Sequence, residues 1–145
     1  MAGLFQECYE LKELDLSGFQ THNVKTMNNM FAGCIKLRSL DLSEFDTNKV
    51  EDLSCMFDGC FELEGVDVSS FSTAAVKNMK RTFANCKRFK ELDLSTWDFS
   101  SLESAPEMLD GCSGDLKFYV DKQKDGFKNL EINDFPVPII QKPEM

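Results

Sequence analysis

Histidine is nearly absent from this chain: His22 is the only one among 145 residues. It lies among polar residues, so we expect it at the surface. The chain also lacks the G-x-S-x-G, H-E-x-x-H and glycine-rich phosphate-binding motifs that mark common nucleophile, metal and phosphate sites. We therefore expect no catalytic residues, no metal and no cofactor, and an enzyme is the weakest of the functional alternatives.

Long apolar runs and positive charge are scarce as well. No run of about 18 apolar residues occurs, so no transmembrane helix is predicted, and the first residues lack the basic and apolar regions of a signal peptide. The 16 Lys and Arg are outnumbered by 25 Asp and Glu, which gives a formal net charge of −9. Nucleic-acid binding needs a basic stripe, and anionic membranes attract basic segments. Neither partner is expected, and neither is membrane insertion.

What the chain does contain is a repeat with a period of 26 residues. Its clearest copy is CIKLRSLDLSEF at 34–45. The cysteines that open the successive copies are Cys8, Cys34, Cys60, Cys86 and Cys112. A fixed period of about 20–50 residues is typical of proteins built from stacked repeat units, each packing on its neighbours.

In the first four units, Leu or Val alternates with Asp and Ser, in an L-D-L-S pattern that becomes V-D-V-S at 66–69, and KFYV at 117–120 occupies the same register in the fifth. Strict alternation is typical of a short, half-buried strand. Strands one full circuit apart must run parallel. The expected strands are 14–17, 40–43, 66–69, 92–95 and 117–120.

A helix is expected after each strand. Thr21, Thr47 and Thr73 are suitable N-cap residues, and the apolar residues that follow recur at spacings of three and four. A 3₁₀ turn or an extended segment would present the same side chains. We thus predict an α/β leucine-rich-repeat solenoid of about five rungs, with short parallel strands on the concave face and short helices on the convex face.

The domain organisation follows from this pattern. The solenoid is expected over residues 1–121, a C-terminal cap over 122–132, and an extended tail or linker over 133–145, where three of the four prolines lie. The five repeat cysteines form one file along the axis and are expected to be free, buried thiols. Cys55 stands outside that file and is expected to be exposed, so it offers a route to disulfide-linked dimers of an otherwise monomeric protein.

An aspartate also recurs once per unit, at Asp15, Asp41, Asp67 and Asp93. Asp is a poor strand former, and strand spacing would bring these carboxylates to about 5 Å from each other. Three interpretations stay open: a solvated row relieved by water and Ser hydroxyls, a ridge for Lys or Arg of a partner, or a cation site. Calcium takes six to eight oxygens around one point, which a linear row does not obviously supply.

The candidate ligand-binding residues all belong to the concave face. They are Asp15, Ser39, Asp41, Ser43, Asp67, Ser69, Glu91, Asp93 and Tyr119. A short basic run, Lys87, Arg88 and Lys90, is interpreted as a solvated edge of one rung. Concave faces are the usual binding surfaces of solenoids.

The pattern F-x-x-C-x-x-L-x-x-L-D-L-S-x-F-x-T, over residues 5 to about 120, resembles the BspA-like leucine-rich repeats of bacterial surface proteins, of the Treponema-pallidum-type class. The resemblance implies a non-catalytic binding module, at the cell surface or secreted, that adheres to an extracellular protein or glycan through its concave face. A structural spacer without a ligand and an intracellular scaffold or effector are the alternatives. The chain carries no signal or anchor and Met1 opens in mid-unit, so we expect a fragment of a longer protein.

Overall fold

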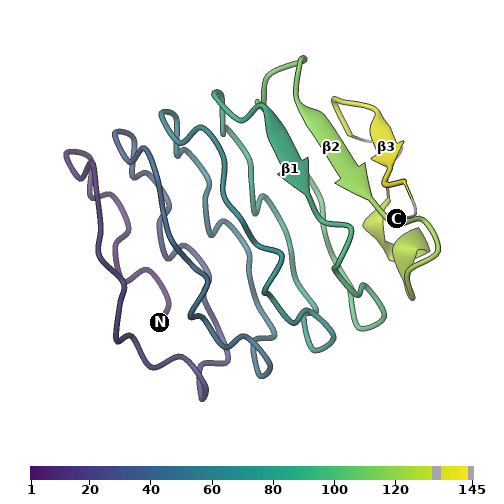
Figure 1. Ribbon diagram of the computed structural model, residues 1–145, viewed down its shortest axis with the longest axis horizontal. Helices are drawn as coiled ribbons and strands as arrows, with labels where there is room; N and C mark the ends of the chain where they lie inside the picture. The colour runs from purple at the N-terminus through teal and green to yellow at the C-terminus, as the bar shows by residue number, and fades with distance from the viewer. Residues whose placement is uncertain (132–134, 144–145) are drawn as a thin grey trace.

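The computed structural model describes residues 1–131 and 135–143 of the chain. Successive repeat units lie side by side, and the chain passes once around each unit before entering the next (Figure 1). The regular elements gather at the C-terminal end, in the order β1 (Glu91–Asp93), β2 (Lys117–Val120), the 3₁₀ helix η1 (Phe127–Leu130) and β3 (Ile139–Gln141). The three strands form one parallel sheet in the order β1-β2-β3.

The predicted leucine-rich-repeat solenoid of about five rungs, with strands on one face and helices on the other, is wrong. The described part of the chain has no α-helix and only three short strands. Of the expected strands, 117–120 coincides with β2 and 92–95 overlaps β1. The segments 14–17, 40–43 and 66–69 are not strands.

The helix expected after Thr21 is replaced by consecutive turns at 28–33. The Met30 N–H donates to the Met27 carbonyl within the unit at 3.2 Å, but the Phe31 N–H donates to the Met56 carbonyl of the next unit at 2.9 Å. An α-helix would keep such N–H groups inside the segment. Asn29 also has a positive φ of 57°, which no right-handed helix contains. Three- and four-residue spacing of buried side chains is therefore produced here by turns.

The same inter-unit bonds recur along the stack. The N–H groups of Phe5, Phe57 and Phe83 donate to carbonyls of the following unit at 2.9, 2.9 and 3.1 Å. Isolated parallel bridges join Thr26 to Asp52, Asp52 to Asn78, and Asn78 to Ser104. We call the side formed by 1–8, 27–34, 53–60, 79–86 and 105–112 the turn side. It holds neighbouring units together through their backbones.

The predicted helix N-caps also have a different role. Thr47 is 2% exposed, and its Oγ1 donates to the Ser72 carbonyl at 3.0 Å while accepting the Ser72 N–H at 2.8 Å. Thr21 and Thr73 link their units to the next unit in the same way. Each hydroxyl therefore satisfies two backbone groups of the neighbouring unit and caps no helix.

The core consists of files of like side chains that run from unit to unit. The rings of Phe5, Phe31, Phe57 and Phe83 stack nearly parallel, with centroid separations of 5.7, 5.7 and 5.5 Å. Phe31, Phe57 and Phe83 are at most 1% exposed. Full burial of a ring contributes roughly 1.5–3 kcal/mol, and each middle ring is covered on both faces only because a neighbouring unit lies on each side.

The repeat cysteines form a second file beside the rings. Cys34, Cys60 and Cys86 are buried, and their Sγ atoms donate to carbonyls of the preceding units at 3.1, 3.2 and 3.3 Å. All six cysteines are free thiols, as predicted for the file. Burial raises the pKa of Cys34 to about 11 and raises those of Cys60 and Cys86 further. Cys55 is half-buried, not exposed as expected.

The C-terminal segment closes the last unit and adds a strand. Leu130 of η1 is fully buried. The segment expected as an extended tail or linker contains β3, which pairs with β2, and Val137, which is 4% exposed. Its prolines lie outside β3 and remove no hydrogen bond from that strand. Part of the expected cap and tail, residues 132–134 and 144–145, lies outside the described residues.

Candidate ligand-binding face

The residues predicted to bind a ligand lie on the side of the stack that carries β1 and β2. The side chains alternate there as expected: Ser39, Asp41 and Ser43 are exposed while Leu42 between them is 1% exposed. Leu40 is only partly buried. We call the outward surface formed by Asp15, Ser17, Asp41, Ser43, Asp67, Ser69, Asp93 and Ser95 the aspartate face.

Each aspartate closes a local turn with the serine two residues later. Asp41 Oδ1 accepts the Ser43 N–H at 3.0 Å and the Ser43 hydroxyl at 2.6 Å. Asp67 accepts the same pair of bonds from Ser69, at 2.9 and 2.6 Å. Asp favours such turns because its carboxylate can bond the backbone two residues on. This role explains why a poor strand former recurs at this position, and sequence reasoning missed it although the D-x-S spacing signals it.

These bonds also set the charge of the face. They lower the pKa of Asp41 and of Asp67 below the ordinary Asp range. The neighbouring carboxylates of Asp93 and Asp41 raise the pKa of Asp67, but the bonds from Ser69 outweigh them. Within the described residues, no hydrogen bond reaches Oδ2 of Asp41 or Asp67. The face is therefore a row of ionised carboxylates, and at Asp41 and Asp67 one oxygen remains available to accept a hydrogen bond.

Small hollows separate neighbouring aspartates. One, of about 220 Å³, lies between Asp41 and Asp67, with Leu40 as an apolar wall. A smaller one, of about 110 Å³, lies between Asp15 and Asp41, next to Leu14. Each hollow therefore offers two carboxylates and an aliphatic surface, which suits the charged head and apolar stem of a lysine or arginine.

At the C-terminal end of the face, a lysine of the chain itself occupies such a position. Lys142 Nζ lies 2.6 Å from Asp93 Oδ2 and 5.0 Å from the centroid of the Tyr119 ring. Burial raises the pKa of Asp93, but the hydrogen bonds from Lys142 and Ser95 outweigh burial. The pKa of Asp93 is therefore lowered overall. A pocket of about 400 Å³ adjoins this contact and is lined by Glu91, Asp93, Tyr119, Lys142 and Pro143.

The predicted residues thus fall into two groups. Asp15, Asp41, Ser43, Asp67 and Ser69 line the two hollows. Glu91, Asp93 and Tyr119 meet at the C-terminal pocket, because Asp93 pairs in register with Tyr119 across β1 and β2. Ser39 is exposed but lines neither. Lys142 was not predicted, because its place depends on the pairing of β3 with β2.

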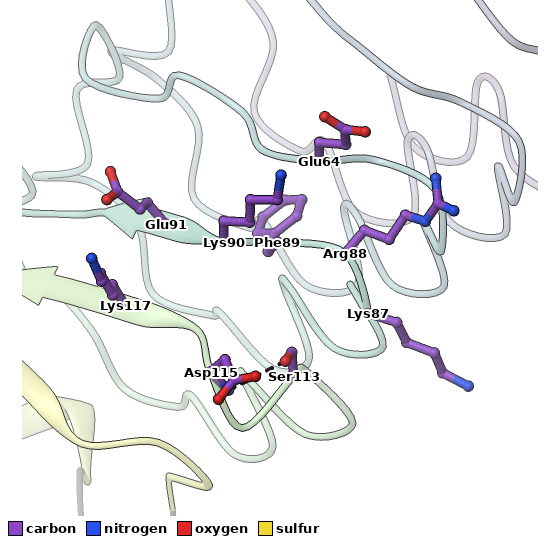
Figure 2. Close-up of a pocket in the computed structure, with 9 residues that line it drawn as sticks. All are labelled: Glu64, Lys87, Arg88, Phe89, Lys90, Glu91, Ser113, Asp115 and Lys117. Carbon is purple, nitrogen blue, oxygen red and sulfur yellow. Dashed lines mark hydrogen bonds between the residues drawn. The ribbon is translucent and has the colours of Figure 1, made fainter.

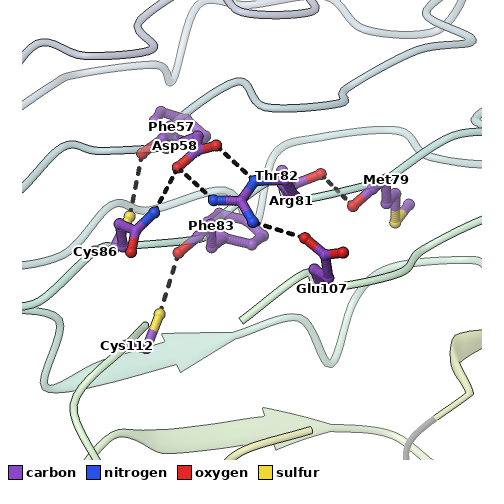
Figure 3. A network of polar contacts seen from close by, with 10 residues as sticks. Phe57, Asp58, Met79, Arg81, Thr82, Phe83, Cys86, Glu107 and Cys112 are labelled. Carbon is purple, nitrogen blue, oxygen red and sulfur yellow. Dashed lines mark hydrogen bonds and ion pairs between the residues drawn. The ribbon is translucent and has the colours of Figure 1, made fainter. Parts of the chain in front are cut away.

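A second charged cluster lies on the turn side (Figure 3). Arg81 donates from Nε to Asp58 at 2.9 Å and from Nη1 to Glu107 at 2.7 Å, while the Asn85 amide donates to Asp58 at 3.0 Å. These bonds raise the pKa of the Arg81 guanidinium. One guanidinium is shared by carboxylates from two other units, so this cluster links three units through their side chains.

Across residues 1–131 and 135–143, no group of three or more His, Cys, Asp or Glu side chains is placed to hold a metal ion. In that same portion, no helix has the length and apolar character needed to cross a bilayer.

Comparison with known proteins identifies the family. Neither the curated proteins nor the solved structures yielded a match. Residues 1–118 match the family described as "Mycoplasma protein of unknown function, DUF285". This match covers the units that carry the ring file, the cysteine file and most of the aspartate face, and the chain therefore belongs to the DUF285 family.

Proposed function

We propose that the chain is a non-catalytic binding module whose aspartate face binds the basic side chains of a protein partner. The observation that carries the proposal is the contact of Lys142 with Asp93 and Tyr119. It is an intramolecular example of a lysine seated on the last aspartate of the row. Asp15, Asp41 and Asp67 offer similar carboxylates, beside apolar hollows, to lysines or arginines from outside.

The spacing of the units suggests how a partner would present its charges. Equivalent rings of neighbouring units are 5.5–5.7 Å apart, and one aspartate accompanies each unit. Residues four apart on a helix surface have Cβ atoms about 5–6 Å apart. A helix with Lys or Arg at every fourth position therefore matches the row of carboxylates.

The resemblance of the repeat to BspA-like surface proteins favours an extracellular partner and a location at the cell surface or in secreted form. A protein fits the aspartate face better than a neutral glycan, since a row of carboxylates attracts positive charge. Opposite charge across such an interface would raise the association rate and select the partner.

A structural spacer without a ligand is the second candidate. The observation that favours it is the pair of bonds from Ser43 to Asp41. Those bonds give the recurring aspartate a role in turn formation that needs no ligand. The two candidates differ in the role of the free Oδ2 atoms of Asp41 and Asp67. A binding module uses them to bind a partner, whereas a spacer leaves them to solvent.

The test compares the binding of two helical peptides of equal charge. One has Lys at every fourth position, so that its lysines share one face of the helix. In the other, the lysines are distributed around the helix. Isothermal titration calorimetry at low ionic strength measures both affinities. The double variant D41N/D67N keeps the Oδ1 acceptors of the turns and removes two charges. Exposed ion pairs contribute about 0.2–1 kcal/mol each, so we expect the variant to bind the ordered peptide about two- to thirtyfold more weakly.

The matched control is E103Q/D125N, which removes two exposed charges elsewhere and should change the affinity little. Equal affinity of D41N/D67N and the wild-type protein would exclude the aspartate face as the contact. If the wild-type protein binds neither peptide, or binds both equally, the spacer becomes the better interpretation.

A further inference from the structure

A pocket lies where the chain enters β1 and β2 (Figure 2). Its volume is about 670 Å³. It is lined by Glu64, Lys87, Arg88, Phe89, Lys90, Glu91, Ser113, Asp115 and Lys117. Four of these nine residues are basic, in a chain whose formal net charge is −9. The basic run interpreted from sequence as a solvated edge thus forms one wall of a pocket.

In the part of the chain that the structure describes, Arg88 and Lys90 in this pocket lack the ion pairs that charged residues form at the same edge of earlier units. There, opposite charges at this edge pair across neighbouring units: Lys36 with Glu10 at 2.7 Å, and Arg38 with Glu62 at 3.3 Å. Arg88 and Lys90 occupy the positions of Lys36 and Arg38 two units further on. Within the described residues, neither has a carboxylate at the ion-pair distance of 4.0 Å. Their charges are therefore available to a ligand.

Core packing and backbone hydrogen bonds position the segments that carry these basic side chains. Phe89 is 1% exposed and is anchored in the core, so the residues on either side of it, Arg88 and Lys90, are turned outward and exposed. The Lys117 N–H donates to the Lys90 carbonyl at 2.9 Å, which fixes the two lysine-bearing segments side by side. Lys87 Nζ lies 4.6 Å from the centroid of the Phe61 ring.

We propose that this pocket binds a sugar that carries a sulfate or phosphate ester. Arg88 and Lys90 supply the donors for the oxyanion, since charge-assisted hydrogen bonds to such oxygens are the strong ones. Lys117 lies at the other end of the lining, where it pairs in register with Glu91 (Figure 2). The carboxylates of Glu64, Glu91 and Asp115 accept hydrogen bonds from sugar hydroxyls. The mixture of cations and carboxylates disfavours a bare polyanion, and the volume lies in the range of small-molecule pockets.

This site is independent of the proposed contact with basic side chains, because it uses charges of the opposite sign. Glu91 lines both this pocket and the C-terminal pocket beside Tyr119, so the two sites adjoin. The acidic chain repels free anions at long range. Selection must therefore come from the contacts inside the pocket, and a simple inorganic anion should bind more weakly than the sugar ester.

The test is an NMR titration of the ¹⁵N-labelled protein with five probes: N-acetylglucosamine, its 6-sulfate, its 6-phosphate, inorganic sulfate and inorganic phosphate. We expect one or both sugar esters to shift the amide signals of residues 87–90 and 113–117. The comparison of the two esters decides which oxyanion is preferred. The free sugar and the inorganic ions should bind at least about tenfold more weakly than the better ester.

The variant R88Q/K90Q should weaken binding of that ester about tenfold or more. The variant K49Q/K80Q removes two charges from exposed positions outside the pocket and should leave the affinity unchanged. The map of shifted signals in the wild-type protein tests the site even if R88Q/K90Q folds poorly. The proposal is overturned if the esters shift signals elsewhere, if inorganic ions bind equally well, if both variants lose affinity alike, or if an acidic peptide binds more tightly than either ester.

Discussion

The turn side and the aspartate face of the same units hold the chain in different ways. On the turn side, the Phe31 N–H donates to the next unit at 2.9 Å, and buried rings and thiols lie behind it. On the aspartate face, the Ser43 N–H is taken by Asp41 of its own unit. In the middle units, backbone hydrogen bonds between units are therefore most frequent on the turn side, the buried threonines add further links, and the aspartate face carries exposed charge.

The same contrast explains why strands appear only at the C-terminal end. No backbone hydrogen bond joins 40–43 to 66–69, whereas β1 and β2 pair in register and the Leu94 N–H extends the pairing to the Tyr119 carbonyl at 2.9 Å. Three variants test how much different parts of the units contribute to the free energy of unfolding. We expect the largest effect in the core behind the turn side.

Removal of one central ring should have the largest effect. Phe57 is 1% exposed and stacks between Phe31 and Phe83, so F57A leaves a cavity that two units share. We expect the free energy of unfolding to fall by about 3–5 kcal/mol, measured by urea denaturation. The half-buried Phe61 is the control, and F61A should cost clearly less. Equal losses would mean that the ring file is not the main source of cohesion.

Loss of one inter-unit threonine should have an intermediate effect. The T47V variant keeps the shape of the side chain but removes both bonds to the Ser72 backbone. Leaving buried polar groups without partners costs about 1–3 kcal/mol, and the same denaturation experiment measures it. T96V, at an exposed position with one long bond of 3.3 Å, should be nearly neutral. A neutral T47V would show that water replaces the hydroxyl.

The aspartate face should contribute least to stability, and only as a function of pH. Hydrogen bonds from Ser43 and Ser69 lower the pKa values of Asp41 and Asp67 in the folded state. Their contribution is therefore complete above the unfolded-state pKa, about 3.9, and is lost as the pH falls through the folded-state values. D41N/D67N should flatten the decline of unfolding free energy below about pH 4. An unchanged acid slope would show that the charges of these two carboxylates do not stabilise the fold.

The candidate site was predictable in part. The outward positions of Ser39, Asp41 and Ser43 follow from their alternation with buried leucines. The contact of Lys142 with Asp93 was not predictable, because it requires the C-terminal segment to return to the sheet. The pocket around Arg88 was missed for a similar reason, since its walls come from segments two units apart in sequence.

The sequence alone determined the period of 26 residues and the side chains that face inward in each unit, because equivalent residues must stack when units repeat. It could not distinguish a helix after Thr21 from consecutive turns at 28–33, since both place Met27, Met30 and Phe31 on the buried side. Only the tertiary structure decided that choice. The N–H groups that a helix would use internally donate to the next unit, and such partners exist only once the units are stacked.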